Sequence, residues 1–320
     1  MNNRKDTNSE LITKLYESIG EQCVTDQDVA HVEIHANRVL GVHLVPGLEI
    51  DASEKDDGIS AGMVVRKGVS IEKPVRICFG LLPESGVQHI DMEVHIEEGA
   101  RVGVLASCTF PNANSIVHTM DARITLDPGA EYLYLERHVH GDEGGVEVVP
   151  RAQVKLSGGA RFRTDFELIR GLVGSIDIDY DAVCGPDSLL EMTARISGRG
   201  DDRIAINEKA HLEGERARGV LKSSIAVRDE AHAIIKNTLV ASAPEARGHV
   251  DCKEIVQGKA QAEAIPVVEV RDPTAHVTHE AAIGSVDSRQ LETLMSRSLS
   301  EDEATDLIIE GLLSPSYRRN

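Results

Sequence analysis

The sequence contains no tryptophan, and aromatic residues make up only 3% of its 320 positions. A core so poor in rings must be built mainly from alanine, valine, isoleucine and leucine, which suits stacked β-sheet better than a bulky ligand cavity. Hydrophobic residues account for 41% and charged residues for 27%, a globular rather than disordered composition. The chain is long enough to bury a substantial core in one large or two ordinary domains.

Positive charge is also scarce, because 34 Lys and Arg face 53 Asp and Glu and leave a net charge of -19. Phosphate contacts dominate nucleic-acid affinity, so this balance argues against a nucleic-acid partner, and equally against an anionic membrane surface. No apolar run approaches the roughly 20 residues of a membrane span. The N-terminal segment has no apolar region of the signal-peptide kind. We therefore expect a cytoplasmic protein that binds neither nucleic acid nor membrane.

Paired cysteines and the common nucleotide and hydrolase motifs are missing as well. The five cysteines form no C-x-x-C pair, which is typical of reduced thiols in a reducing compartment; they are Cys23, Cys78, Cys108, Cys184 and Cys252. The nearest approach to a P-loop is "GERARGVLKSS", where Gly219 is followed by Val220 instead of lysine. No G-x-S-x-G or H-E-x-x-H motif occurs. The chain is not expected to bind ATP by itself.

What the sequence does contain is an internal repeat. Gly-Ala pairs recur at Gly99, Gly129 and Gly159, each 30 positions after the last, and apolar residues alternate after each pair. A second apolar series lies about half a period away, at Ile116, Val146 and Ile176. Alternation bounded by turn residues predicts strands, and a fixed period predicts a sheet that winds on itself. Two half-turns of about 15 residues make one rung of a parallel β-helix, or β-solenoid. A jelly roll is the competing all-β architecture, but it predicts no such period.

The two ends of the chain have helical patterns. Residues 9–21 form a short amphipathic helix within an N-terminal region 1–44, which precedes a β-helix core at 45–285. In a C-terminal helical region, 286–320, Asp287 with Gln290 and Ser300 with Glu303 have the spacing of helix caps. One apolar stripe is expected on the second helix, formed by Ala304, Leu307, Ile308, Gly311 and Leu312. These helices either cap the open edge of the solenoid or present a surface to a partner.

The stretch "ARGHVDCKEIVQG" places Cys252 in an alternating run. On this alternation Cys252 and His279 face the same side, 27 residues or nearly two half-rungs apart, while Glu280 points to the other side. Neighbouring strands lie ~4.8 Å apart, so thiol and imidazole should approach each other within about two residues of register. A buried cysteine with a hydrogen-bonded core histidine would explain the same spacing. Thiolate, imidazole and carboxylate are otherwise the usual ligands of iron or zinc, and a nearby positive group would lower the thiol pKa.

Two other histidines, His138 and His140 in "HVH", share one strand face. They form a possible metal pair, but without a nearby third ligand we expect them to be surface residues. Cys78, Cys108 and Cys184 lie on strand-like runs and are expected in the core, without a further role. No role is assigned to Cys23.

The segment from Cys252 to the chain end carries a specific resemblance. "AIPVVEV", "DPTAHVTHEAAIG" and "LMSRSLSEDEATDLIIEGLL" resemble the C-terminal signature of the SufB/SufD family, densely over about 215–313 and more loosely from about 45 to 214. The resemblance implies a right-handed parallel β-helix whose chains pair through their β-helices. It also implies C-terminal helices that dock a SufC-like ABC-type ATPase. The family's functional cysteine falls on Cys252, and its histidine and glutamate fall on His279 and Glu280, a SufB-like set.

The chain departs from the family in two respects: its N-terminal region is short, and Ser298 stands where members usually carry glycine. We therefore expect a minimal homodimeric scaffold that is not an enzyme. It would hold a transient iron–sulfur cluster at Cys252, His279 and Glu280, and use ATP only through its partner. It would take sulfur from a donor and pass the cluster to apoproteins. A β-helical carbohydrate-active enzyme and an ATPase adaptor with an inert Cys252 remain the alternatives.

Overall fold

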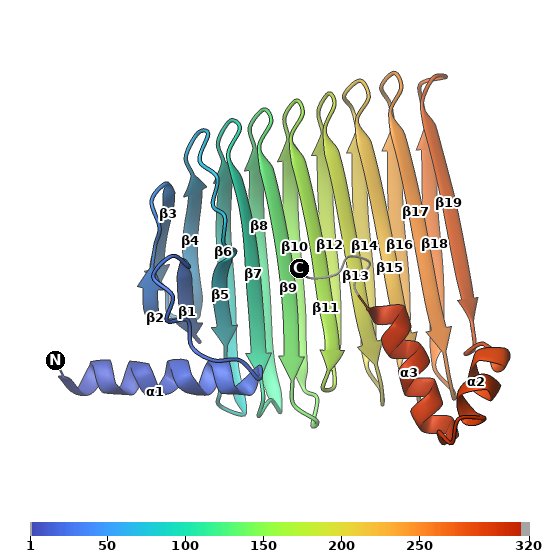
Figure 1. The fold of residues 1–320 in the computed structure, drawn as a ribbon, viewed down its shortest axis with the longest axis horizontal. Helices are drawn as coiled ribbons and strands as arrows, with labels where there is room; N and C mark the ends of the chain where they lie inside the picture. The colour runs from blue at the N-terminus through green and yellow to red at the C-terminus, as the bar shows by residue number, and fades with distance from the viewer. Residues whose placement is uncertain (1, 315–320) are drawn as a thin grey trace.

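The computed structural model describes residues 2–314, with side chains from residue 7 onward. Two long sheets face each other and the chain passes from one to the other at each half-turn, as a flattened solenoid (Figure 1). Sheet A contains β1 (His31–His35), β2 (Arg38–His43), β5 (Val75–Gly80), β7 (Arg101–Phe110), β9 (Glu131–His140), β11 (Arg161–Arg170), β13 (Leu189–Gly198), β15 (Arg218–Val227), β17 (Arg247–Val256) and β19 (His276–Gly284). Sheet B contains β3 (Leu48–Glu54), β4 (Gly58–Val65), β6 (Ser85–Ile96), β8 (Ser115–Leu126), β10 (Val146–Leu156), β12 (Ser175–Cys184), β14 (Arg203–Leu212), β16 (His232–Ala241) and β18 (Gln261–Val270).

The strand register confirms the predicted parallel β-solenoid and its period. Val146 on β10 lies opposite Ile116 on β8, a step of 30 residues. Leu189 on β13 lies opposite Arg218 on β15, a step of 29. Among the strands of residues 2–314, only the pairs β1–β2 and β3–β4, at the N-terminal end, are antiparallel. Each full turn of the chain therefore adds one strand to each sheet.

The same turn conformation continues beyond the three Gly-Ala pairs, in rungs that have no glycine at this position. Gly99, Gly129 and Gly159 have φ of 68–70°, a left-handed conformation that favours glycine. The equivalent positions in the next turns are Asp187 and Arg216, at φ 56° and 58°. The backbone turn is thus kept where the sequence no longer repeats, which explains why only three Gly-Ala pairs are visible in the sequence.

Between the sheets lies one continuous core of inward-facing residues. Alanine, valine, isoleucine and leucine supply most of it, as the composition predicted. The few rings stack from rung to rung, for example Tyr132 on Phe162 with centroids 5.4 Å apart. Alternate residues of each strand face solvent, giving the strict alternation of burial seen along β9 and β12.

The N-terminal part contains more strand than expected. Helix α1 (Asn2–Ser18) buries Leu15, and Ile19 is buried in the turn that follows, before Gly20 with φ of 73°. The β-core begins at His31, ahead of the predicted boundary at residue 45, because β1 pairs in parallel with β5 and antiparallel with β2. These strands have only five and six residues, too short to show a clear alternation in the sequence.

At the other end, α2 (Ser288–Met295) and α3 (Glu301–Leu313) begin at the predicted caps. Asp287 accepts from the backbone N–H of Gln290, and Ser300 with Glu303 forms a reciprocal capping box. Ser298, between the two helices, has φ of 72°, a conformation that glycine adopts without strain. Residues 315–320, the end of the predicted C-terminal region 286–320, lie outside the described residues.

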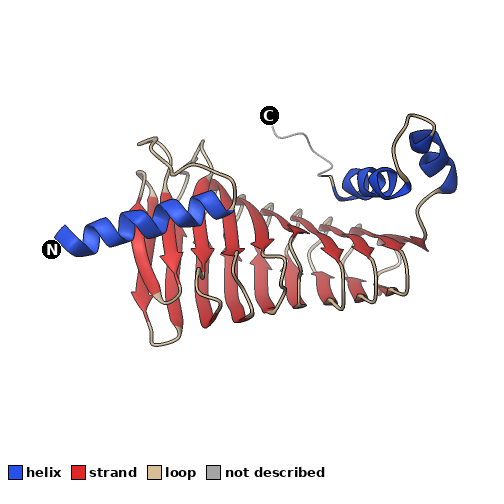
Figure 2. Cartoon of the chain, turned by 90° about the horizontal axis from the view of Figure 1, so that it is seen from below, coloured by secondary structure: helices blue, strands red, loops and turns tan. Residues whose placement is uncertain are grey.

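The packing of α3 differs from the expected stripe. Its buried apolar side chains are Ala304, Ile309 and Leu313, whereas Leu307 is 48% exposed. Ile309 and Leu313 pack against Ala226 on the outer face of sheet A. The helices therefore lie along one face of the solenoid and leave its C-terminal end open (Figure 2). Within the described chain, no helix combines the length and apolar character needed to cross a membrane.

Candidate functional site

Cys252 lies on the inner face of β17, near the open end of the solenoid. Its side chain is fully buried, in line with Val250 and Glu254, which occupy the same face of the strand. On the neighbouring strands it lies opposite Ser223 of β15 and Ala281 of β19. Only one strand of sheet A, β19, separates this thiol from the end of the sheet.

His279 lies on β19, on the same face as Cys252. It is opposite Val250, so it is displaced from Cys252 by two residues along the neighbouring strand. A strand spacing of ~4.8 Å and a rise of ~3.3 Å per residue place the two Cα atoms roughly 8 Å apart. His279 is exposed, because β19 is the last strand of sheet A and no further rung covers it. The predicted two-residue register between thiol and imidazole is therefore what the strand pairing gives.

The surroundings of the Cys252 thiol disfavour its ionised form. Burial raises its pKa, and hydrogen bonds from Ser223 and Asn237 offset this only in part. The Asn237 amide donates to Sγ at 3.6 Å. The expected lowering of the thiol pKa by a neighbouring positive group is thus wrong for the single chain, because burial and the carboxyl groups of Glu254 and Asp251 raise this pKa. A metal ion or an opening of the end would be needed to produce the thiolate.

Glu280 does not share this face. It lies opposite Asp251 on β17, whose side chain pairs with Lys253 at 2.9 Å on the outer surface. Both acidic groups raise the pKa of Lys253, the Asp251 hydrogen bond first. One chain therefore brings Cys252 and His279 to one face of the sheet and Glu280 to the other, as the alternation predicted.

An inward carboxyl group that the sequence reasoning missed is Glu254. It is 3% exposed, and Ser223 donates a hydrogen bond to its Oε1 at 3.2 Å. Its Oε2 has no hydrogen-bond partner among the described residues, and burial raises its pKa to about 7. The alternation Val250, Cys252, Glu254 was present in the sequence and would have identified it.

The burial of the other cysteines agrees with the prediction, but the burial of His138 and His140 does not. Cys78, Cys108 and Cys184 are buried as expected, and all five cysteines are free thiols. The prediction that His138 and His140 are surface residues is wrong, because they are 1% and 5% exposed and face the interior of the solenoid. The parity of their strand follows Tyr132 and Tyr134, which point inward.

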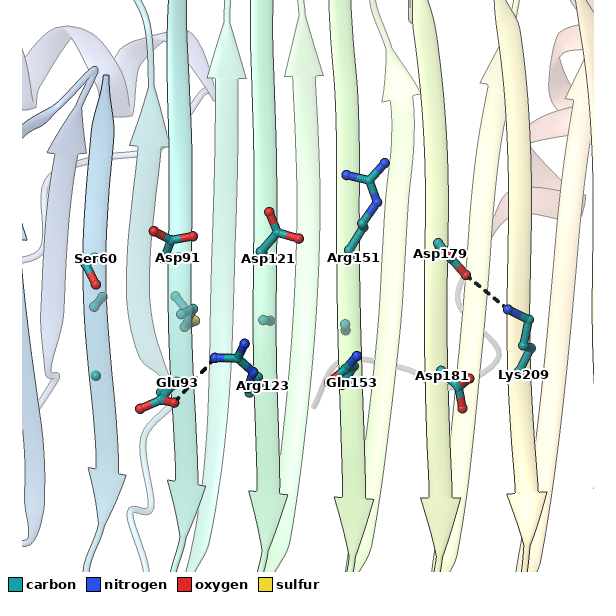
Figure 3. A pocket seen from close by; sticks show the side chains of 15 residues that line it. Ser60, Asp91, Glu93, Asp121, Arg123, Arg151, Gln153, Asp179, Asp181 and Lys209 are labelled. Atoms are coloured by element: carbon teal, nitrogen blue, oxygen red, sulfur yellow. Dashed lines mark ion pairs between the residues drawn. The ribbon is translucent and has the colours of Figure 1, made fainter. Parts of the chain in front are cut away.

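Two hollows on the surface of the solenoid are relevant to function. The outer face of sheet B holds a hollow of about 690 Å³ with two rows of polar side chains (Figure 3). Charges of both signs alternate there, with Arg123 near Glu93 at 3.8 Å and Lys209 near Asp179 at 3.6 Å. Its lining residues include no aromatic ring of the kind that carbohydrate-binding grooves use.

A second, apolar groove of about 910 Å³ lies between α2, α3 and the ends of β17 and β19. The stripe expected on α3 lines this groove, where Leu307, Ile308 and Leu312 are available for contact. The groove thus joins the helix pair to the strands that carry Cys252 and His279.

Comparison with known proteins covers this whole region. A family model described as SUF system FeS cluster assembly, SufBD core domain, matches residues 82–312. An iron–sulfur cluster assembly SufBD family protein of Methanocaldococcus jannaschii is 35% identical over 309 residues, which cover 95% of this chain and 98% of that protein. One of Pyrococcus horikoshii is 30% identical over 305 residues, covering 95% and 93%. The iron–sulfur cluster assembly protein SufB of Bacillus subtilis is 26% identical over 261 residues, covering 78% and 54%.

Proposed function

Because this chain belongs to the SufBD family of iron–sulfur cluster assembly proteins, we propose that it is a scaffold that holds a nascent cluster at the open end of its solenoid. The cluster is cargo. Cys252 accepts sulfur or binds iron through its thiolate, and His279 supplies an imidazole ligand. The chain is not an enzyme in this proposal. A donor delivers sulfur, and apoproteins receive the cluster.

The observation that carries the proposal is the placement of Cys252 beside an exposed imidazole at the last strand of sheet A. Glu254 offers a carboxylate on the same inner face, and its free Oε2 makes it a further candidate ligand. Glu280, on the outer face of the exposed strand β19, would contribute only at an interface between two chains. Together these groups are the mixed sulfur, nitrogen and oxygen donors that bind iron.

The open end also supports a homodimer. Strands β18 and β19 are the outermost strands of their sheets, and unpaired edges of this length readily join another chain. Val267, Val270 and Ile283 on these strands are 37–48% exposed. We propose that two copies meet here and cover the site between them.

The apolar groove beside α2 and α3 is the proposed docking surface for a SufC-like ABC-type ATPase. Its side chains are apolar, and α3 is fastened to sheet A close to the site. ATP binding in the partner would then bias the chain between an open and a covered site. Five free thiols agree with a cytoplasmic location, where cysteines stay reduced.

Co-expression of the full chain with a SufC-like ATPase, followed by purification without oxygen, tests this function. We expect a stable complex that contains iron and sulfide and absorbs visible light. A Leu307→Asp variant should lose the ATPase, whereas Val87→Asp, at an exposed valine near the other end, should keep it. A complex that forms but stays colourless would make the chain an adaptor. Release of uronides from pectin-type polymers by the purified chain would instead favour a carbohydrate-active enzyme.

A further inference from the structure

A second group of metal-binding side chains lies inside the solenoid, far from Cys252. Cys108 on β7 is directly opposite His138 on β9, and His118 reaches them from β8 in the facing sheet. One ligand atom of each residue lies within 4.8 Å of the other two. Five strand spacings along sheet A, about 24 Å, separate β7 from β17. The two groups are therefore distinct sites.

We propose that Cys108, His118 and His138 form a binding site for one divalent transition-metal ion of the zinc or iron class. A thiolate with two imidazoles is a common ligand set for these ions. The three residues come from three strands that the rung geometry fixes, so the site requires no loop to close over it.

The residues around Cys108, His118 and His138 are of the kind found around metal ligands. Glu136 Oε1 is 2.7 Å from His138 Nε2, and His138 Nδ1 is 3.3 Å from His140 Nε2, so both ring nitrogens of His138 contact polar groups. A carboxylate in contact with a ligating histidine holds its ring in orientation. Glu136 Oε1 is also 4.0 Å from the Cys108 sulfur. The ring centroid of Phe110 lies 5.1 Å from that of His118, and the ring centroid of Phe166 lies 4.8 Å from that of His138, so apolar rings border the group.

Two buried polar atoms beside these residues also point to a ligand. His118 Nδ1 and Glu136 Oε2 are buried without a hydrogen-bond partner among the described residues. Burying a polar atom without a partner costs on the order of 1–3 kcal/mol. A divalent ion beside one thiolate and one carboxylate would leave the interior electrically neutral.

Access to the cluster is restricted. The side chains of Cys108, His118 and His138 are all at most 3% exposed. A surface pocket of about 480 Å³ is lined in part by His138, but the imidazole itself does not reach it. A metal bound there should exchange slowly and resist chelators, in contrast to one at the exposed end of the solenoid.

Cobalt is the probe, because its spectrum reports thiolate and imidazole ligands. The full chain is produced in cells grown with added cobalt, treated with a chelator, and analysed for metal content and for thiolate-to-cobalt absorption. We expect roughly one chelator-resistant cobalt per chain in wild type, and the same in Cys252→Ser. Cys108→Ser should lose it. Absence of retained cobalt from wild type, or its full retention in Cys108→Ser, would overturn the proposal.

X-ray absorption of cobalt in the Cys252→Ser protein keeps the test independent of any folding defect in Cys108→Ser. One sulfur and two imidazoles around the metal support the site, and an all-oxygen shell refutes it. Because Cys252→Ser removes the proposed cluster ligand but not this site, failure of one proposal leaves the other standing.

Discussion

Carboxyl groups inside the solenoid are the residues whose protonation most affects stability. Glu208 on β14 is 2% exposed, lies opposite Asn237, and has its pKa raised by burial to about 8. In the unfolded chain a glutamate titrates near 4.5. The folded state therefore holds a proton that the unfolded state releases over this range.

The contribution of Glu208 to the free energy of unfolding should accordingly fall as pH rises from about 5 to 8. Glu208 contributes fully below the unfolded pKa, and its contribution is lost as pH rises, by at most about 1.4 kcal/mol per pH unit. Glu208→Gln should reduce the difference in unfolding free energy between pH 5.5 and 8, measured by urea titration. Glu147→Gln, at an exposed position on β10, is the control. An unchanged pH dependence in Glu208→Gln would show that Glu208 is ionised in the folded chain.

For single residues, the sequence predicted which side chains lie on neighbouring strands better than it predicted their burial and pKa. The spacing between Cys252 and His279 gave their register, because a solenoid converts sequence period into strand pairing. It did not give the direction of the thiol pKa, which depends on burial beneath β19. The sequence also did not reveal that Cys108, a ligand of the proposed metal site, lies beside His138. The two residues are 30 positions apart and belong to different rungs.

Helix α3 is attached to the solenoid by apolar packing and by one buried arginine. Arg195 on β13 is 5% exposed and pairs with Asp165 at 2.9 Å and Glu167 at 2.8 Å. Its Nη1 also donates to the backbone oxygen of Leu313 at 2.7 Å. The C-terminal end of α3 is thereby fixed to sheet A, next to the groove proposed to receive the ATPase.

Arg195→Met should release this attachment and destabilise the chain by about 3–5 kcal/mol, because removing the cation of a buried ion pair is strongly destabilising. Amide hydrogen exchange should increase over residues 301–313. Arg228→Met is the matched control: Arg228 also reaches α3, through Asp306, but Asp306 is 64% exposed and such a pair contributes only about 0–1 kcal/mol. Equal effects of the two variants would contradict the attachment by Arg195.

The helix boundaries that depend on short-range hydrogen bonds were predicted correctly, whereas the packing of the helices was not. The caps at Asp287 and Ser300 fixed the starts of α2 and α3, since each is a short-range hydrogen bond. The buried face of α3 was misassigned, because its apolar residues are divided between sheet A and the groove. Which face meets the sheet is decided by partners distant in sequence, such as Ala226.

For the whole molecule, the period of the sequence was enough to predict the solenoid, since parallel stacking follows from equal rungs. The uncovered end was not predicted, because the position of the helix pair depends on tertiary contacts. The proposed homodimer forms through this open end. Val267 on the edge strand β18 is 37% exposed and would be covered in the proposed dimer.

Val267→Lys should convert the dimer to a monomer, because the charge would be buried at the edge. Sedimentation equilibrium of wild type and variant measures this directly. Val87→Lys changes a valine of similar exposure on β6, away from the open end, and should leave the dimer intact. A monomeric wild type, or a Val267→Lys chain that remains dimeric, would place the interface elsewhere.

Anaerobic reconstitution of the purified chain with iron and sulfide tests the role of Cys252 most directly. Iron content and visible absorption would be compared among wild type, Cys252→Ser and Cys184→Ser, the last removing a buried thiol on β12 of the other sheet. We predict that wild type and Cys184→Ser bind a cluster, and that Cys252→Ser stays folded but binds little or none. A full complement of cluster in Cys252→Ser would contradict the account.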